Sequence, residues 1–182
     1  AVGQELGDNR LQAEFVPGKH DLVLWAEATE GPAAQIGRYV ASANGYVAEA
    51  VRTVEFATRI KVAANGDLVV VQERGGVIVI DGGSLHVKRR LPISSVGEPI
   101  IRSEVLHPAL PIAVVGTDYG KIVAWNWDSD ELVFERRYFP REEVQWINSL
   151  AVDSQVGCVL FSANNVLFRV RLDDGDVDLR EQ

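Results

Sequence analysis

The sequence is poor in sulfur: its 182 residues include one cysteine, Cys158, and no methionine. One thiol cannot form an intramolecular disulfide or a thiolate metal cluster, so the fold is expected to be held without cross-links. Cys158 stands in the apolar segment GCVLFS, which predicts a small buried side chain. Because methionine is missing even at position 1, the sequence favours a segment of a longer chain over the removal of an initiator residue.

Long apolar runs are missing too. The longest, such as residues 68–71 and 77–80, are far shorter than the roughly 20 residues that cross a bilayer. The N-terminal segment AVGQELGDNR has no basic region followed by an apolar stretch, which argues against a retained secretory signal. We therefore expect no membrane association and an intracellular protein, cytoplasmic or nuclear.

Basic residues are fewer than acidic ones, and the formal net charge is −8. Binding to phosphate backbones needs a basic face, so this balance disfavours nucleic acid as a partner. A protein or peptide with a basic surface is the more natural complement.

The common catalytic motifs are absent. The sequence has no G-x-S-x-G elbow, no glycine-rich phosphate loop and no C-x-x-C pair. The histidines His20, His86 and His107 show no metal-binding spacing such as H-x-x-x-H. We therefore expect no enzyme activity and no cofactor.

Helical periodicity is nearly absent, whereas short runs rich in Val, Ile and Leu recur between clusters of Gly, Asn and Asp, which predicts an all-β fold. Self-comparison then reveals a repeat. Aligning LHPALPIAVVGTDYGKIVAWN with VAANGDLVVVQERGGVIVID places Gly120 on Gly75 and Trp125 on Ile80. The segment VDSQVGCVLFSANNVLFRV fits the same frame and places Asn165 on Gly120, so both offsets are 45 residues (75 to 120 and 120 to 165).

The repeat divides the chain into modules of about four strands each. Their bounds are roughly residues 12–57, 58–92, 99–139 and 146–180. An antiparallel unit of about 45 residues has the size of a propeller blade. A four-stranded sheet has two apolar faces, so such blades must stack on neighbours around a common axis. The sequence therefore predicts one β-propeller unit, or a segment of one, over residues 1–182.

Acidic side chains recur at matching places in the modules. The segment GKHDLVLWAE resembles NGDLVVVQE, with Asp21 on Asp67, while Glu27, Glu73 and Asp118 fall at equivalent turns. Acidic residues beside Gly are ordinary in hairpin turns. The same recurrence fits a ring of carboxylates around a channel for a metal or a cationic substrate, so both interpretations stay open.

The third module, PIIRSEVLHPALPIAVVGTDYGKIVAWNWDSDELVF, resembles a WD-repeat blade, with an HP turn, an Asp-containing turn and a third strand that ends in Trp. Blades of that family carry G-x-x-x-x-W-D after the turn, which falls here on Gly120, Trp125 and Asn126. The literal pair Trp127-Asp128 is shifted outward by two residues. Trp125, like Trp25 of the first module, is thus expected to pack inside the sheets.

The resemblance also implies a polar network of a turn Asp, a strand hydroxyl, an upstream His and the Trp. Asp118 and Trp125 match the first and last members, whereas residues 113–115 offer no hydroxyl and the family's Gly-His pair is missing. The second module, LVVVQERGGVIVIDGGSLHVKRRLPI, is equally similar to quinoprotein-like or lactonase-like propellers.

Four blades leave exposed sheet edges unless the ring closes. Three arrangements satisfy this requirement: the chain is part of a longer protein, two copies or another chain complete the ring, or the protein is a small four-bladed propeller.

The resemblance to WD-repeat domains implies a non-catalytic scaffold for protein or peptide partners, as a subunit of a larger assembly. Partners of that family contact the turns between the second and third strands and the connections between blades, and tryptophan beside arginine is a common contact residue. The contact residues expected here are Arg74, Arg102, Asp118, Tyr119, Trp127 and Trp146. The alternative is a propeller enzyme, quinoprotein-like or lactonase-like, with a polar site at the axis.

Overall fold

The chain is all-β, as the sequence predicts. The computed structural model describes residues 11–16, 18, 21–27, 33–55, 57–72, 76–91, 100–140 and 146–181. These residues contain strands and turns and no helix, and so no helix that could cross a bilayer. The chain divides into two compact units, Ala1–Pro92 and Ile93–Gln182.

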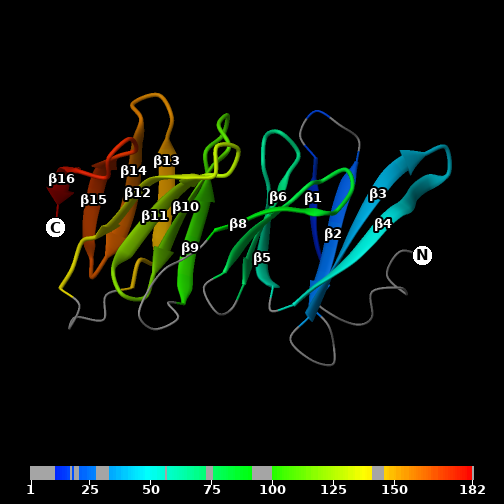
Figure 1. Cartoon of the computed structure of the whole chain (residues 1–182), viewed down its shortest axis with the longest axis horizontal. Helices are drawn as coiled ribbons and strands as arrows, with labels where there is room; N and C mark the ends of the chain where they lie inside the picture. The colour runs from blue at the N-terminus through cyan, green and yellow to red at the C-terminus, as the bar shows by residue number, and fades with distance from the viewer. Residues whose placement is uncertain are drawn as a thin grey trace. The chain divides into compact units, whose positions relative to one another are not determined.

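The first unit contains two antiparallel sheets of four strands (Figure 1). In each, the strands pair in chain order, so every connection is a hairpin. The first sheet is formed by β1 (Leu11–Phe15), β2 (Leu22–Glu27), β3 (Ala33–Ser42) and β4 (Gly45–Glu55). The second is formed by β5 (Ala57–Val62), β6 (Leu68–Gln72), β7 (Val77–Ile80) and β8 (Val87–Leu91).

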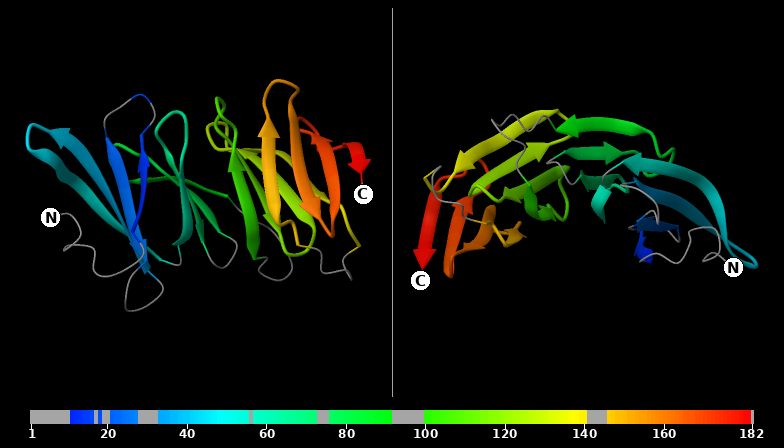
Figure 2. Two further views of the ribbon diagram at one scale, coloured as in Figure 1. Left: turned by 180° about the vertical axis from the view of Figure 1, so that it is seen from behind. Right: turned by 90° about the horizontal axis from the view of Figure 1, so that it is seen from below.

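The second unit repeats this plan, and its strand β13 lies beside β9 of the neighbouring sheet (Figure 2). One sheet consists of β9 (Ile101–Leu106), β10 (Ile112–Thr117), β11 (Lys121–Asn126) and β12 (Glu131–Arg137). The other consists of β13 (Ser149–Asp153), β14 (Cys158–Ala163), β15 (Val166–Arg171) and β16 (Val177–Glu181). The bounds of the four sheets lie within a few residues of the four modules in the sequence.

The 45-residue repeat appears in the pairing of the third and fourth strands. In all four sheets this pairing contains a register shift of the β-bulge type. In the last three sheets the shift follows Val79, Ala124 and Arg169, positions that are 45 residues apart (79 to 124 and 124 to 169). The turn residues agree: Gly120 and Asn165, aligned by the sequence repeat, both have positive φ, 64° and 61°. The repeat is therefore structural.

The first unit is held together by apolar side chains from both of its sheets. Trp25 and Ile36 of the first sheet belong to one buried cluster with Leu68 and Ile80 of the second. The side chains of β6 and β7 are buried on both faces, except that Gln72 at the end of β6 is partly exposed. This explains the continuous apolar runs at residues 68–71 and 77–80, because a strand buried on both faces shows no polar alternation.

The second unit has a more aromatic core. The rings of Phe161 and Phe168 on adjacent strands stack with their centroids 4.7 Å apart and nearly parallel. Tyr138 packs on Phe161 at 4.9 Å, and Phe139 meets the edge of Phe168 at 5.4 Å. The segment that follows β12 is thereby packed onto the last sheet, since such ring pairs stabilise beyond the apolar area that they bury.

Two expectations about single residues are confirmed. Trp125, on the third strand of the third sheet, is fully buried, as is expected at that position of the repeat. Cys158 is buried as well, and burial raises the pKa of its thiol.

Two turns of the first unit approach each other so closely that only glycine fits. A Cβ on Gly82 would lie 1.9 Å from the carbonyl oxygen of Gly66. We predict that Gly82→Ala lowers the free energy of unfolding by about 3 kcal/mol, because backbone must move to relieve the overlap. Gly83→Ala is the matched control: its Cβ would meet the Asp81 carboxylate at 3.2 Å, and a loss of about 1 kcal/mol or less is expected. Urea denaturation of both variants measures the difference, and equal losses would contradict the close approach.

The HP turn of the second unit depends on a neutral imidazole. The Nδ1 atom of buried His107 accepts hydrogen bonds from the backbone N–H groups of Ala109 (3.1 Å) and Leu110 (2.9 Å). Protonation at Nδ1 would break both bonds, and burial lowers the pKa of His107 below its usual value. The unfolded chain therefore takes up this proton more readily than the folded one.

We predict that this contribution to stability is complete above about pH 6.5, the usual pKa of histidine, and is lost as the pH falls from there toward the lower folded pKa. His107→Asn places an amide oxygen where Nδ1 was and does not titrate. The difference in unfolding free energy between the two proteins should therefore depend on pH between about 5 and 7. A constant difference across this range would show that the imidazole is not the titrating group.

Candidate functional site

An exposed tryptophan stacks on an arginine at the surface of the second unit. Trp146 precedes β13 and is 50% exposed. The guanidinium of Arg102, on β9, lies over the indole at 4.6 Å from the ring centroid, a cation–π distance. The stack thus joins the connection between β12 and β13 to strand β9.

The outward position of Trp146 follows from the burial of the next residue, Ile147. The Ile147 backbone N–H donates to the carbonyl of Thr117 at 3.2 Å, and its own carbonyl accepts from the Ser103 hydroxyl at 2.7 Å. Its side chain lies against Gly116, where a Cβ would come within 2.4 Å of it. Because Ile147 is anchored on both sides, its neighbour Trp146 is held at the surface.

Tyr119 and Ile100 extend this surface. The backbone N–H groups of Tyr119 and Lys121 donate to the Thr117 hydroxyl at 3.3 Å each, which shapes the β10–β11 turn. The Tyr119 carbonyl accepts from Arg137 at 2.6 Å. The side chains of Ile100 and Tyr119 are partly exposed. We call the group Ile100, Arg102, Tyr119 and Trp146 the Trp146 surface.

Two of the residues expected to contact a partner are buried. Asp118 is 8% exposed because it bonds to the main chain of Ile100. Its carboxylate accepts a hydrogen bond from the Ile100 N–H at 3.2 Å, and its own N–H donates to the Ile100 carbonyl at 3.1 Å. Trp127 is 1% exposed, since its backbone bonds to Pro111 and its side chain turns inward two residues after Trp125. The assignment of these two side chains to a contact surface is thereby corrected.

Of the other four expected contact residues, the structure describes three. Arg102 and Trp146 stack on each other, and Tyr119 is exposed in the β10–β11 turn, close to where Thr117 bonds to Ile147; the binding role of all three stays a prediction. Arg74 lies outside the described residues. Sequence reasoning missed Ile100 and the anchoring pair Gly116 and Ile147, because the segment QWIN does not indicate which strand it will pair with.

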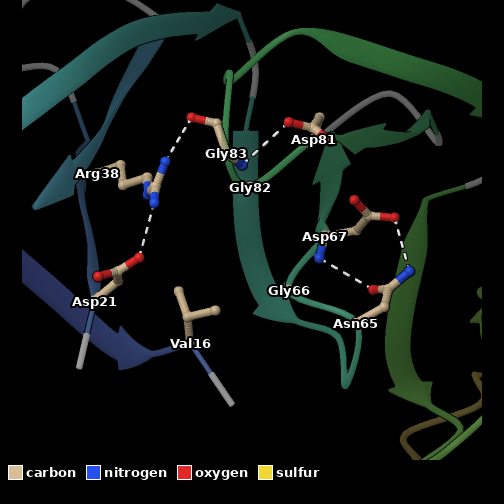
Figure 3. A pocket seen from close by; sticks show the side chains of 9 residues that line it. All are labelled: Val16, Asp21, Arg38, Asn65, Gly66, Asp67, Asp81, Gly82 and Gly83. Atoms are coloured by element: carbon tan, nitrogen blue, oxygen red, sulfur yellow. Dashed lines mark hydrogen bonds and ion pairs between the residues drawn. The ribbon is translucent and has the colours of Figure 1, made fainter. Parts of the chain in front are cut away.

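A polar cavity of about 180 Å³ lies in the first unit (Figure 3). Arg38 of β3 lies between its two walls. It donates to the Asp21 carboxylate at 2.8 Å and to the Gly83 carbonyl at 2.8 Å, and it pairs with Glu49 at 2.9 Å. The lining residues are Val16, Asp21, Arg38, Asn65, Gly66, Asp67, Asp81, Gly82 and Gly83.

The other two carboxylates of this cavity are also engaged. Asp67 accepts from Asn65 at 2.9 Å and pairs with Lys88 at 2.8 Å. Asp81 accepts from the backbone and hydroxyl of Ser84 and from the Gly83 N–H, and these bonds hold the pKa of the Asp81 carboxyl below its usual value. All three carboxylates thus bind neighbouring groups, and Arg38, which joins Asp21 to the Gly83 carbonyl, ties the first sheet to a turn of the second. The alignment of Asp21 with Asp67 marks these two carboxylates as equivalent positions of the repeat but does not show that they line one cavity.

Only some of the carboxylates that the sequence suggested as a ring belong to the described part of the structure. Glu73 and the side chain of Glu27 lie outside the described residues, whereas Asp118 bonds to backbone. His20 also lies outside them, and His86 is exposed. Among the residues that the structure describes, no three His, Cys, Asp or Glu side chains are placed to hold a metal ion.

Comparison with models of known protein families and with curated proteins gave no match.

Proposed function

We propose that this chain is a non-catalytic interaction module whose four sheets are blades of a WD-type β-propeller, and that it binds an intracellular protein or peptide partner through the Trp146 surface. The stack of half-exposed Trp146 on Arg102 is the observation that carries this proposal. Tryptophan and arginine are the residue types most often responsible for binding energy at protein interfaces.

The rigidity of the Trp146 surface supports the same function. Ile147 is fixed by two main-chain hydrogen bonds, and the β10–β11 turn is shaped by Thr117. A side chain that is already ordered loses little conformational entropy when a partner binds, so more of the contact energy appears as affinity. Binding residues presented by connections on a rigid β framework are a common arrangement.

The exposed edges of the sheets support a place in a larger assembly. Strand β4 is the edge of the first sheet, and most of its residues are exposed, including Val47 and Val51. A second copy or another chain that completed the propeller would cover such an edge and satisfy its backbone groups.

We predict that Trp146→Ala strongly reduces partner capture while leaving the fold intact. Truncation of a central contact tryptophan costs about 2 kcal/mol or more, which lowers affinity by about thirtyfold. Quantitative affinity purification from the native cells, followed by mass spectrometry, measures the loss against wild-type protein.

Phe15→Ala is the matched control, because Phe15 is also a largely exposed aromatic residue, at 62%, but belongs to the first unit. It should retain the captured proteins. An unchanged set with Trp146→Ala, or the same loss with both variants, would rule out the Trp146 surface as the binding site.

A further inference from the structure

A second surface of the second unit has a different character from the Trp146 surface. Strand β10 runs from Ile112 to Thr117, and the Trp146 surface adjoins its Thr117 end. At the Ile112 end lies an open groove of about 460 Å³ between the two sheets of this unit. The groove is lined by Ile112, Val133, Val156, Gly157, Arg171, Leu172 and Asp173.

The groove and its surroundings are apolar. Val156, at the tip of the β13–β14 turn, is 67% exposed, and Leu172 and Ile112 form the floor as members of the unit's core. Leu110, in the β9–β10 turn, and Val177, at the start of β16, are also exposed. The β9–β10 and β13–β14 turns lie at the upper edge of the unit in Figure 1. Exposed apolar side chains beside an open groove are typical of binding surfaces.

The same end of the unit is strongly acidic. Its four hairpin connections, taken with the strand residues that flank them, cover residues 107–112, 126–133, 153–158 and 170–177, and in these segments one basic residue, Arg171, stands against seven carboxylates. The carboxylates are those of Asp128, Asp130, Glu131, Asp153, Asp173, Asp174 and Asp176. The Arg171 guanidinium is already paired with Asp174, with Asp176 at 2.8 Å and with Asp173 at 3.8 Å, and Arg136 of β12 reaches this end and also pairs with Asp176. The groove therefore carries a net negative rim.

We propose that this groove binds a partner segment in which a bulky apolar side chain stands next to Lys or Arg. The apolar side chain fills the space between Val156 and Leu172, and its basic neighbours face the carboxylates of the rim. Charge complementarity of this type selects the partner and speeds association, whereas an acidic segment would be repelled. The site stands independently of the Trp146 surface at the other end of β10.

A second copy of the chain is a poor occupant. The chain as a whole carries a net charge of −8, so two copies repel. Its basic segment KRRL, residues 88–91, lies in β8, where Lys88 pairs with Asp67 and Leu91 is buried. The apolar side chain of that segment is not available to the groove of another copy.

Selection of random peptides displayed on phage against the full chain tests the proposal. The peptides enriched by the selection are expected to carry Lys or Arg beside Leu, Ile, Phe or Trp. Their affinity, measured by fluorescence polarisation of the synthetic peptides, should fall about tenfold with Val156→Ser, which removes apolar contact. It should fall similarly with Asp173→Lys, whose side chain is 81% exposed, and binding to wild type should weaken as salt rises.

Val47→Ser is the matched control, because Val47 is another valine on the surface of a hairpin, in the first unit, and is 55% exposed. This variant should bind the peptides as wild type does. Each variant replaces an exposed residue, and circular dichroism establishes that it is folded.

Several results would overturn the proposal. These are the recovery of no specific peptide, a preference for acidic peptides, or binding that survives both Val156→Ser and Asp173→Lys. Peptides lost with Trp146→Ala but kept with Val156→Ser would overturn it too, while supporting the first surface. Sedimentation showing a dimer that Val156→Ser dissociates would instead assign the groove to a second copy.

Discussion

Burial of the apolar sheet faces against one another is the constraint on which the rest of this structure depends. A single four-stranded sheet cannot hide both faces from water, so each unit pairs two sheets around one cluster of large apolar side chains. Within the paired sheets, Gly82 approaches Gly66 between two turns of the second sheet, and Phe161 stacks on Phe168 of the adjacent strand in the last sheet. With the strands fixed in this way, the residues of the connecting turns can differ from one sheet to the next.

Because the turns differ in sequence, the two ends of the second unit differ in character. At one end Ile147 takes up a buried position and leaves Trp146 outside beside Arg102, a compact contact with one aromatic ring at its centre. At the other end the turns surround an open apolar groove with carboxylates, and Arg171 is neutralised by its neighbours. Both ends are built on the same strand, β10, so the two proposed binding surfaces share one structural element.

Local pattern predicted much of the fold and little of the surface. The Val-rich runs and the positions of Gly120 and Asn165 were enough to find the strands, the turns and the 45-residue repeat, because strand periodicity and turn geometry are local properties. The burial of Trp127 and Asp118 was missed, since it depends on bonds to Pro111 and Ile100 far away in the sequence. The groove and the polar cavity were not predicted for the same reason. Each combines residues from two different sheets, and the spacing of residues within one module does not show which turns meet.

The bulge that recurs between the third and fourth strands has a consequence for the behaviour of the chain at high concentration. A bulge sharpens the twist of the strand that contains it and interrupts the regular row of backbone donors and acceptors. A fourth strand shaped in this way is a poor template for the flat, in-register stacking of amyloid. Straightening the bulge by deleting one residue from a fourth strand would therefore favour fibril growth from the edge that this strand forms.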